Sequence, residues 1–594
     1  MSKETAKHIE AVRQQMRSVG VDAVIIPGTD PHQSEYISDY WKVRDWVSGF
    51  TGSNGTAVIT LNEAALWTDS RYFLQAAEQL EGSGMVMHRE NGPNPDTKEE
   101  WLADVLADVE DAVIGIDGRL FSARQVNELE QFCFSNGFRL ATDFAPADRV
   151  WTDRPARPAG KAMVHDIKYA GETVESKLER IEACIEIQQA DAMLVAALDC
   201  IAWALNLRGT DVAFTPVVTS FLYISEPETV LFIDPDKVTD EVARHLKASG
   251  VKVKDYDDVE KYLGKIRENV SVLVDPDEVN DRLASAIASK IFAKNPIAML
   301  KGVKNEVEIE GFRRAMERDG AALVRTFMWV EKMAPTDTIT ETDVARRAIE
   351  ERRKEELYTD ESFGMIAGYA AHGAIVHYEP EDATAATLHA DGLLLIDTGG
   401  QYLDGTTDIT RTISLGNPTE AQRHHYTLVL KGHLALGNAV FPEHTRGVQL
   451  DVLARQFLWK EHLTYFHGTG HGVGHYLSVH EGPQSIRTQE NPVELVPGMI
   501  TSNEPGLYIT DQYGIRIENC VLTVNAGENA DFGGFMKFED LTLFPYDLSL
   551  IDKTMLTSLE VDQINAYHRM VRERLASHLN AEELAWLEAK TAEI

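Results

Sequence analysis

The sequence predicts an α/β protein that continues into an α+β region, and three observations support this class. Residues 1 to about 155 alternate helical patterns with short strands rich in Val, Ile and Ala, and residues 158–300 repeat this alternation. From about residue 360 onward, after a long helix, strands and turns predominate. Because 594 residues exceed what one hydrophobic core supports, we place domains at 1–157, 158–300 and 301–594.

The first predicted domain begins with an amphipathic helix, MSKETAKHIEAVRQQMRSVG. Short strands follow at VDAVIIPG, GTAVITL and AALWTDS, and another helix begins near Arg71. Helices interleaved with such strands are typical of an α/β layer. The segment TDRPARPAGKA, residues 152–162, is rich in proline and charge and indicates a linker.

The second predicted domain repeats the order of the first. A helix, ETVESKLERIEACIEIQQ, carries Leu178, Ile181 and Ile185 on one face and precedes ADAMLVAALDCIAWALNLRG and TVLFID. The first domain has the same order in VDAVIIPGTDPHQSEYI and AALWTD, which suggests a duplicated α/β module. Coincidental α/β patterning explains the similarity about equally well.

The third region opens with a long amphipathic helix at residues 304–332. Its apolar stripe consists of Ile309, Phe312, Met316, Leu323, Phe327 and Val330. Pro335 ends this helix, and Thr340 with Asp343 has the pattern of a helix N-cap and its acidic partner. Strand patterns follow at GAIVHYEP, GLLLIDTGGQYLDGTTDITRTISLG, GMITSNEPGLYI and YGIRIENCVLTV. Two amphipathic helices, LEVDQINAYHRMVRERL and AEELAWLEAK, end the chain.

The composition argues against nucleic-acid and membrane partners. With 57 Lys and Arg against 94 Asp and Glu, the formal charge is −37, which repels phosphate backbones and anionic lipids. The N-terminus lacks the apolar core of a signal peptide, and MLVAALDCIAWALNL is broken by Asp199 well short of a membrane span. Four scattered cysteines without a C-x-x-C pair fit a reducing compartment. We therefore expect a soluble cytoplasmic protein.

Residues 467–475, HGTGHGVGH, place three histidines four residues apart, with glycine at each even position between them. Four glycines would cost a helix about 4 kcal/mol, so we expect a strand with its histidines on one side and bare backbone on the other. Neighbouring histidines of a strand lie about 13 Å apart, so only one of them can ligate a given metal ion. Tight packing of a Gly-rich strand is the alternative interpretation.

Four acids occur in strand patterns of the third region: Asp397, Asp408, Glu504 and Glu518. Asp397 ends an apolar run, and a buried carboxylate is costly unless a cation pairs with it. In YGIRIENC, Arg516 and Glu518 share one face of the strand. Salt bridges to Arg411 or Arg516 explain any single acid, but four acids together with a glycine-flanked histidine favour a metal centre.

The segments DTGGQYLDGTTDITRT, HGTGHGVGHYLSVHEGP, SNEPGLY and GIRIENC resemble the signature segments of the aminopeptidase P (Xaa-Pro aminopeptidase) family in its long cytosolic form. HQSEYI, WTDSRYF and LNLRGTDVAFTPV resemble the two N-terminal domains of that family, so the resemblance covers almost the whole chain. It implies two creatinase-N-like α/β domains, then a C-terminal pita-bread catalytic domain with a helical extension. It also implies a cytoplasmic homodimer.

By this resemblance, two divalent ions are held by Asp397, Asp408, His471, Glu504 and Glu518. Asp408 and Glu518 bridge the ions. Asp397 completes the site of one ion, and His471 with Glu504 completes the site of the other. Four carboxylates balance the charge of two dications, and oxygen ligands with one imidazole favour Mn²⁺, with Co²⁺, Zn²⁺ or Fe²⁺ as alternatives.

The resemblance also implies a reaction, hydrolysis of the N-terminal Xaa-Pro bond of a peptide by a hydroxide that bridges the two ions. Glu504 takes up the proton, while His377 and His480 bond the carbonyl oxygen and the developing oxyanion. His467 joins them in the catalytic and substrate-binding set. Arg516 binds substrate by orienting a carboxylate, with a structural salt bridge as the alternative.

Some choices rest on the resemblance alone, and other activities of the same fold stay open. The family pattern, not the spacing, selects His471 over His467 and His475, and we treat His475 and His372 as ordinary residues. A prolidase would cleave only Xaa-Pro dipeptides. A creatinase-like amidinohydrolase and a peptidase-dead binding module of the histone-chaperone type would both lack the ligand set.

Overall fold

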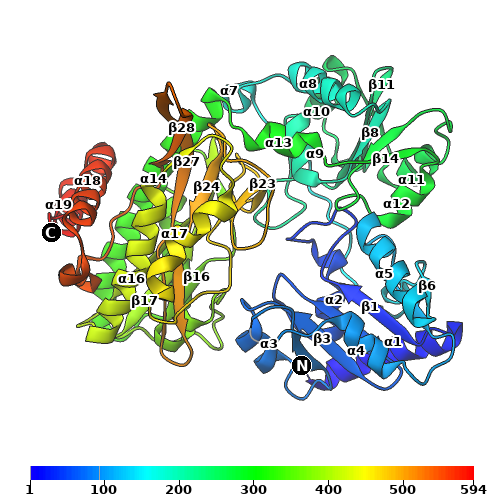
Figure 1. Cartoon of the computed structure of the whole chain (residues 1–594), viewed down its shortest axis with the longest axis horizontal. Coiled ribbons are helices and arrows are strands. Elements are labelled where there is room, and N and C mark those ends of the chain that lie inside the picture. Colours follow the sequence, from blue (N-terminus) through cyan, green and yellow to red (C-terminus); the bar gives the residue numbers. More distant parts are fainter. Residues whose placement is uncertain (1, 93) are drawn as a thin grey trace. The chain divides into compact units, whose positions relative to one another are not determined.

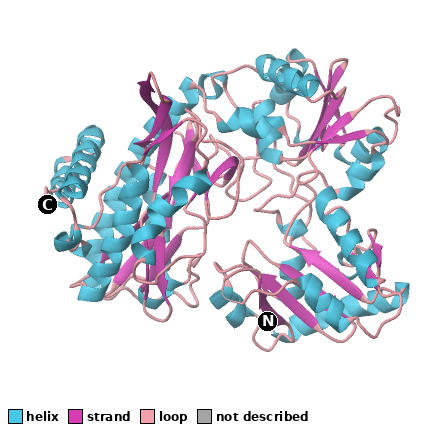
Figure 2. Cartoon of the chain, viewed as in Figure 1, coloured by secondary structure: helices cyan, strands magenta, loops and turns pink. Residues whose placement is uncertain are grey.

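The computed structural model describes residues 2–92 and 94–594, and its chain divides into two compact units. The first unit comprises the chain up to Asp166 together with Glu172–Ile297. The second comprises Ile167–Gly171 and Ala298–Ile594. Each unit contains both helices and strands (Figure 1, Figure 2), as the sequence predicts.

A six-stranded sheet in the order β4-β3-β2-β1-β5-β6 forms the first half of the first unit. Its strands are β1 (Ala23–Pro27), β2 (Thr56–Thr60), β3 (Ala64–Thr68), β4 (Val86–Arg89), β5 (Val113–Gly115) and β6 (Arg139–Ala141). Its helices are α1 (Ser2–Val19), α2 (Val43–Ser48), α3 (Phe73–Gln79), α4 (Lys98–Val105), α5 (Ala123–Asn136) and α6 (Ala147–Val150). Alternate residues of β1 join different cores: Ile26 lies in one with Val12 of α1, and Ile25 in another with Leu129 of α5. Helices therefore cover both faces of this sheet.

The second half of the first unit repeats this topology, with the sheet order β12-β11-β10-β8-β13-β14. Its strands are β8 (Ala192–Val195), β10 (Ser220–Ser225), β11 (Glu228–Ile233), β12 (Val251–Lys254), β13 (Val272–Val274) and β14 (Lys290–Phe292). Its helices are α8 (Val174–Ile187), α9 (Leu198–Ala204), α10 (Asp240–Ala248), α11 (Val259–Leu263) and α12 (Asp281–Ala286). In both halves the central strand pairs antiparallel on one side and parallel on the other, β1 with β2 and β5, and β8 with β10 and β13. The shared order confirms a duplicated module and excludes chance patterning.

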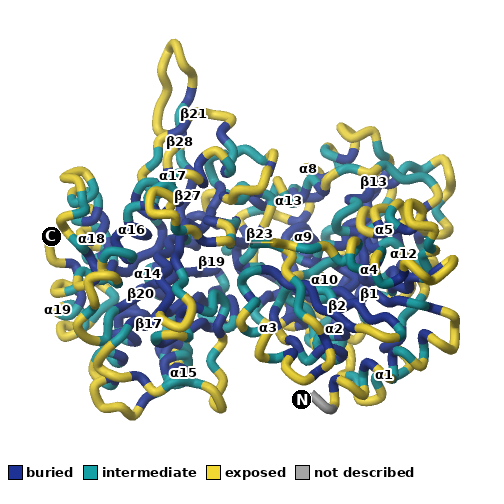
Figure 3. Tube along the Cα trace, turned by 60° about the horizontal axis from the view of Figure 1, so that its bottom comes forward, coloured by how far each residue is buried: buried dark blue, intermediate teal, exposed yellow. Residues whose placement is uncertain are grey.

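The second unit combines helices with two main sheets, one in the order β16-β17-β20 and one in the order β21-β28-β27-β24-β22-β23. The strands of the first are β16 (Ile366–Tyr369), β17 (Leu393–Thr398) and β20 (Ile409–Ser414). Those of the second are β21 (Val440–Pro442), β22 (Gly470–Gly472), β23 (Glu481–Ile486), β24 (Ile500–Asn503), β27 (Asn519–Asn529) and β28 (Gly533–Asp540). A further three-stranded sheet consists of β15 (Tyr358–Glu361), β18 (Gly400–Tyr402) and β19 (Gly405–Thr406), and β25 (Gly506–Ile509) pairs with β26 (Tyr513–Arg516). The strands β17 and β20 are buried, whereas the far ends of β27 and β28 are largely exposed (Figure 3).

The helices of the second unit are α7 (Ile167–Ala170), α13 (Pro296–Gly302), α14 (Glu306–Met333), α15 (Glu341–Arg352), α16 (Glu420–Gly437), α17 (Gly447–Trp459), α18 (Ser558–Leu575) and α19 (Ala581–Lys590). The last six of these share one core with the two main sheets. Phe327 of α14, Leu394 of β17 and Ile500 of β24 belong to the same buried cluster as Leu575 and Leu587 of the two C-terminal helices. The C-terminal helices therefore close the core of this unit.

Most predicted elements of the third region are confirmed. The helix predicted at 304–332 is α14, and its whole apolar stripe is buried. This helix ends at Met333, two residues before Pro335, and the capping box of Thr340 and Asp343 starts α15. None of the helices within residues 2–92 and 94–594 combines the length and apolar character that a bilayer crossing requires.

The continuous strand predicted for 467–475 is wrong. Only Gly470–Gly472 pairs as a strand, and the register shifts between His471 and Gly472, whose partners in β23 are Ser485 and Glu481. The three histidines therefore do not lie on one continuous strand. The ring of His475 is buried against Phe312 of α14, with ring centroids 5.6 Å apart.

Candidate metal centre

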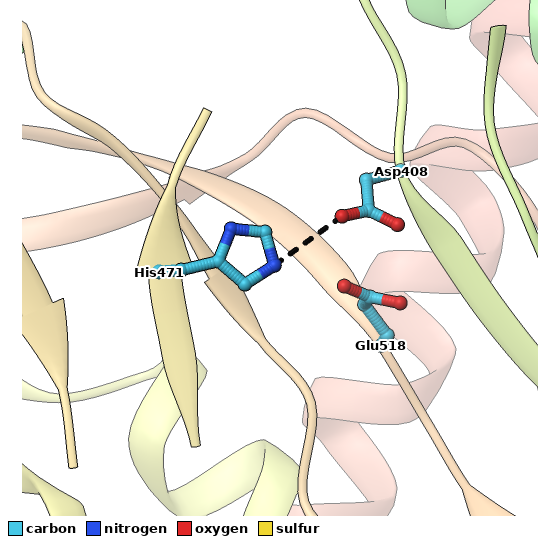
Figure 4. A group of neighbouring side chains, drawn as sticks. All are labelled: Asp408, His471 and Glu518. Atoms are coloured by element: carbon cyan, nitrogen blue, oxygen red, sulfur yellow. Dashed lines mark ion pairs between the residues drawn. The ribbon is translucent and has the colours of Figure 1, made fainter. Parts of the chain in front are cut away.

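Asp408, His471 and Glu518 meet in the second unit, with one ligand atom of each within 4.8 Å of the others (Figure 4). Asp408 directly precedes β20, His471 lies in β22, and Glu518 lies between β26 and β27. Nε2 of His471 is 3.4 Å from Oδ2 of Asp408. Nδ1 of His471 donates to the carbonyl oxygen of Gly472 at 2.9 Å, which directs Nε2 toward the acids. A metal-ligating histidine is commonly fixed in this way.

Glu504 joins this group from the end of β24. Its Oε1 lies 3.3 Å from Nε2 of His471, and its main-chain N–H donates to Thr469 at 2.8 Å. The hydroxyl of Ser502 links the two residues, because it accepts from the N–H of His471 and donates to Oε1 of Glu504, both at 3.0 Å. Main-chain pairing of neighbouring strands therefore places Glu504 beside His471.

Asp397 lies in β17 and is 8% exposed. Its Oδ2 accepts from Nη2 of Arg516 at 2.6 Å, so the cation that the sequence requires for this acid is present. Its Oδ1 is buried and has no hydrogen-bond partner among the described residues. Such a bare carboxylate oxygen costs free energy unless a cation contacts it.

Burial and neighbouring charges shift the pKa values of Asp397, Glu518 and His471. Burial, reinforced by the charges of Asp408 and Glu504, raises the pKa of Asp397 to about 6 in spite of Arg516. Burial also raises the pKa of Glu518 well above its usual value, and Asp408 and Asp397 add to the shift. Burial lowers the pKa of His471, but its bond to Asp408 and the charge of Glu504 outweigh this and raise it to about 9. The protein part of the site thus needs additional positive charge.

This donor set fits a pair of divalent ions. With the four acids ionised, Arg516 alone leaves a surplus of three negative charges. Carboxylate oxygens with one imidazole suit Mn²⁺ and related ions, and the bare Oδ1 of Asp397 is a further available donor. The residues present therefore match the chemistry of a dinuclear centre.

Glycine is required where β22 passes between its neighbours. A Cβ atom at Gly470 would lie 1.9 Å from the carbonyl oxygen of Ser502 in β24. A Cβ atom at Gly472 would lie 2.3 Å from the carbonyl oxygen of Glu481 in β23. The glycines of HGTGHGVGH thus allow close backbone contact on both sides of His471, which confirms the packing interpretation.

The other predicted histidines occupy different positions. Nε2 of His467 bonds the hydroxyl of Tyr508 at 2.8 Å, and its Nδ1 lies 3.9 Å from Oε2 of Glu504. The ring of His480 meets the ring of His471 edge-on, with centroids 4.4 Å apart. His377 is partly buried in the loop before β17. His372, treated as an ordinary residue, bonds Glu341 at 3.0 Å.

Two supporting residues were missed by reasoning from the sequence. Tyr508 accepts from Nη1 of Arg516 at 2.7 Å and so connects Arg516 to His467. Arg411 is 1% exposed and donates to the main-chain oxygens of Thr410 and Glu518 at 2.9 and 2.6 Å. Arg411 therefore holds two ligand-bearing segments together, whereas the sequence suggested it only as a partner for an acid. Both residues lie close in sequence to a predicted ligand, Tyr508 to Glu504 and Arg411 to Asp408, and this nearness is the signal that could have identified them.

Four family descriptions match the chain. Metallopeptidase family M24 matches residues 310–525, and the C-terminal region of peptidase M24 matches residues 534–594. Creatinase/prolidase N-terminal domains match residues 8–148 and 153–308.

Relatives of known name match over nearly the full length. Aminopeptidase P2 of Arabidopsis thaliana is 41% identical over 94% of this chain and 84% of its own length. A probable Xaa-Pro aminopeptidase P of Aspergillus fumigatus is 38% identical over 99% of this chain and 93% of its own. The crystal structure of X-prolyl aminopeptidase from Caenorhabditis elegans, described as a cytosolic enzyme with a di-nuclear active site, superposes with a TM-score of 0.96. It is 34% identical and is matched over 99% of this chain and 100% of its own. This chain belongs to metallopeptidase family M24, in the Xaa-Pro aminopeptidase P group, and is a hydrolase.

Proposed function

We propose that this protein removes the N-terminal residue from peptides whose second residue is proline, as the names of its relatives indicate. The observation that supports this most strongly is the buried group of Asp408, His471 and Glu518, with Glu504 3.3 Å from the same imidazole. Such a concentration of carboxylates around one histidine suits metal-assisted hydrolysis.

Two divalent ions, preferably Mn²⁺, with Co²⁺, Zn²⁺ or Fe²⁺ as substitutes, would be held by Asp397, Asp408, His471, Glu504 and Glu518. When bound, the ions polarise the scissile carbonyl and supply a hydroxide nucleophile at neutral pH. Ser502 and Arg411 keep the ligand-bearing segments in register.

The protein side chains would manage the proton and the oxyanion. Glu504 accepts the proton released by the attacking water, and Ser502 orients its carboxylate. His377 and His480 donate to the carbonyl oxygen as negative charge develops on it. His467, linked through Tyr508 to Arg516, positions the substrate, and Arg516 orients the carboxylate of Asp397. The proline nitrogen carries no N–H in the substrate and must gain a proton before it leaves.

We further propose a cytoplasmic homodimer that acts on peptides and binds neither nucleic acid nor membranes. The net charge of −37 supports the exclusion of polyanionic partners. Alternatives within the fold differ in substrate length, since a prolidase is confined to dipeptides.

The test is hydrolysis of Arg-Pro-Pro and of the dipeptide Arg-Pro by the purified full-length chain, before and after metal removal. We expect release of arginine from the tripeptide, little cleavage of the dipeptide, loss of activity after chelation and recovery with Mn²⁺. Preference for the dipeptide would indicate a prolidase, and activity that survives complete chelation would contradict a metal mechanism.

A further inference from the structure

Lys301, Lys304 and Glu481 form a buried ionic cluster in the second unit. Nζ of Lys304 lies 2.5 Å from Oε1 of Glu481, and Nζ of Lys301 lies 3.0 Å from Oε2. The three side chains are only 2%, 1% and 1% exposed, respectively. Lys304 also donates to the carbonyl oxygen of Lys301 at 2.9 Å.

This composition is costly for stability alone. Removing two ammonium groups and a carboxylate from water carries a large desolvation penalty. Apolar residues of similar volume often stabilise such a position equally well. A buried ionic group therefore indicates a requirement for one defined geometry, and its neighbours show which geometry that is.

The cluster connects the segments that surround the metal centre. Glu481 directly follows His480, and its carbonyl oxygen lies so close to Gly472 that only glycine fits there. Its carboxylate is 2.7 Å from the position that a Cβ atom of Gly474 would take. The N–H of Lys304 donates to the carbonyl oxygen of Gly498 at 2.9 Å, just before β24. Glu481 is thereby fixed against the strand of His471 and, through Lys304, against the strand that leads to Glu504.

His480 is the residue that this arrangement places. Its ring stands edge-on to the His471 ring, with centroids 4.4 Å apart and planes at 75°. We propose that Glu481, clamped by Lys301 and Lys304, is a positioning residue that holds His480 at the metal centre for contact with the substrate carbonyl. The inference rests on the role of His480 in the proposed function.

The test compares Glu481→Gln, His480→Ala and the double variant in the full-length Mn²⁺-loaded protein, with Arg-Pro-Pro as substrate. His480→Ala should lower kcat/KM about 100-fold through the lost donor. Glu481→Gln should lower it about 10-fold, mainly in kcat, through displacement of His480. The double variant should match His480→Ala within about twofold, because the positioning effect has no target without the imidazole.

Two measurements separate positioning from general damage. Both single variants should keep the wild-type manganese content, since neither residue is a ligand. A crystal structure of Glu481→Gln should show the His480 ring displaced from its position 4.4 Å from His471. Glu560→Gln is the matched control, because Glu560 also faces a lysine, Lys431 at 2.7 Å, but links α16 to α18. It should leave kcat/KM unchanged.

The outcomes are distinct. If His480→Ala retains full activity, the proposed role of His480 fails and the positioning role fails with it. If His480→Ala lowers kcat/KM but the effects of His480→Ala and Glu481→Gln on kcat/KM multiply, Glu481 has only a structural role. That result overturns the present inference and leaves the proposed function intact. Should Glu481→Gln not fold, Lys301→Met preserves the closer Lys304–Glu481 pair and replaces it in the cycle. If Lys301→Met lowers kcat/KM by itself but has no effect in the His480→Ala background, the positioning role is supported. If the effects of the two substitutions on kcat/KM multiply, the positioning role is contradicted.

Discussion

The acids of the candidate metal centre are held by contacts between residues that lie far apart in the chain. Arg516 reaches Asp397 at 2.6 Å, and His471 lies 3.4 Å from Asp408 and 3.3 Å from Glu504. The sequence predicted that Asp397 needs a cation because it ends an apolar run. It named Arg411 and Arg516 as candidate partners of the acids but did not choose between them, since the 119 residues between Asp397 and Arg516 are bridged only by the folded sheet.

In the proposed function, Glu504 is the side chain that accepts the proton. Glu504→Gln keeps the shape of the residue but removes its ability to accept a proton, so kcat should fall by about 100- to 10,000-fold. Steady-state hydrolysis of Arg-Pro-Pro with saturating Mn²⁺ measures the effect.

The control for this substitution is Glu528→Gln, in the exposed part of β27, which should retain the wild-type kcat. A Glu504→Gln variant as active as the control would remove Glu504 from the mechanism.

For single helices and strands, hydrophobic periodicity was a better guide than the spacing of the histidines. The 3.6-residue periodicity located α14 to within two residues at its start and one at its end, because its buried stripe is continuous. The strand pattern predicted around Asp397 and Asp408 was also confirmed, as β17 pairs with β20. The strand predicted around His471 was too long, because the irregularity between His471 and Gly472 depends on the neighbouring strands β23 and β24 and not on the residues of β22.

The glycines of β22 differ in what they can tolerate. Gly470→Ala would bring a Cβ atom to 1.9 Å from the carbonyl oxygen of Ser502, which forces β22 and β24 apart. We expect a loss of about 1 to 3 kcal/mol in the free energy of unfolding. Urea titration followed by tryptophan fluorescence gives this value.

Gly468 provides the control two residues earlier, because its nearest neighbour to an added Cβ is 3.6 Å away. Gly468→Ala should change the stability little. Equal losses in the two variants would contradict the close approach of β22 to β24.

His568 makes α18 sensitive to acid. Its Nε2 accepts from the N–H of Tyr546 at 3.0 Å, and burial, with a contribution from Arg411, lowers its pKa to about 3. Below pH 6.5 the His568 imidazole is protonated in the unfolded chain but stays neutral in the folded protein, so the free energy of unfolding falls as the pH is lowered. The expected loss at pH 5 relative to pH 7.5 is about 2 kcal/mol from this residue.

Urea titrations at the two pH values test this claim when the wild type is compared with His568→Gln. The glutamine amide can accept the same bond but does not titrate, so the variant should lose about 2 kcal/mol less than the wild type over this range. An identical pH dependence in both proteins would show that His568 is not the cause of the lower stability at pH 5.

At the scale of the whole molecule, the class and order of the domains were predictable, because the α/β alternation of the first half and the strand-rich second half differ visibly in the sequence. The two N-terminal sheets share one strand order, which the weak sequence similarity could only suggest. The cluster of Lys301, Lys304 and Glu481 was not predictable, since 177 residues separate Lys304 from Glu481 and no local pattern shows which of these side chains meet.

Metal binding should protect the two units unequally. The candidate ligands all lie in Ala298–Ile594, and a ligand stabilises the state that binds it. Hydrogen exchange with and without Mn²⁺ should therefore show slower exchange in segments around Asp397, His471 and Glu518. The described residues of the first unit should exchange at unchanged rates, and protection confined to that unit would place the ions elsewhere.

The central claim is that buried acids from distant segments tolerate one another because two dications neutralise them. The most direct measurement is anomalous diffraction from a crystal grown with Mn²⁺. The account predicts two anomalous peaks enclosed by Asp397, Asp408, His471, Glu504 and Glu518. Density without a peak among these five side chains, or manganese bound only at other positions, would contradict it.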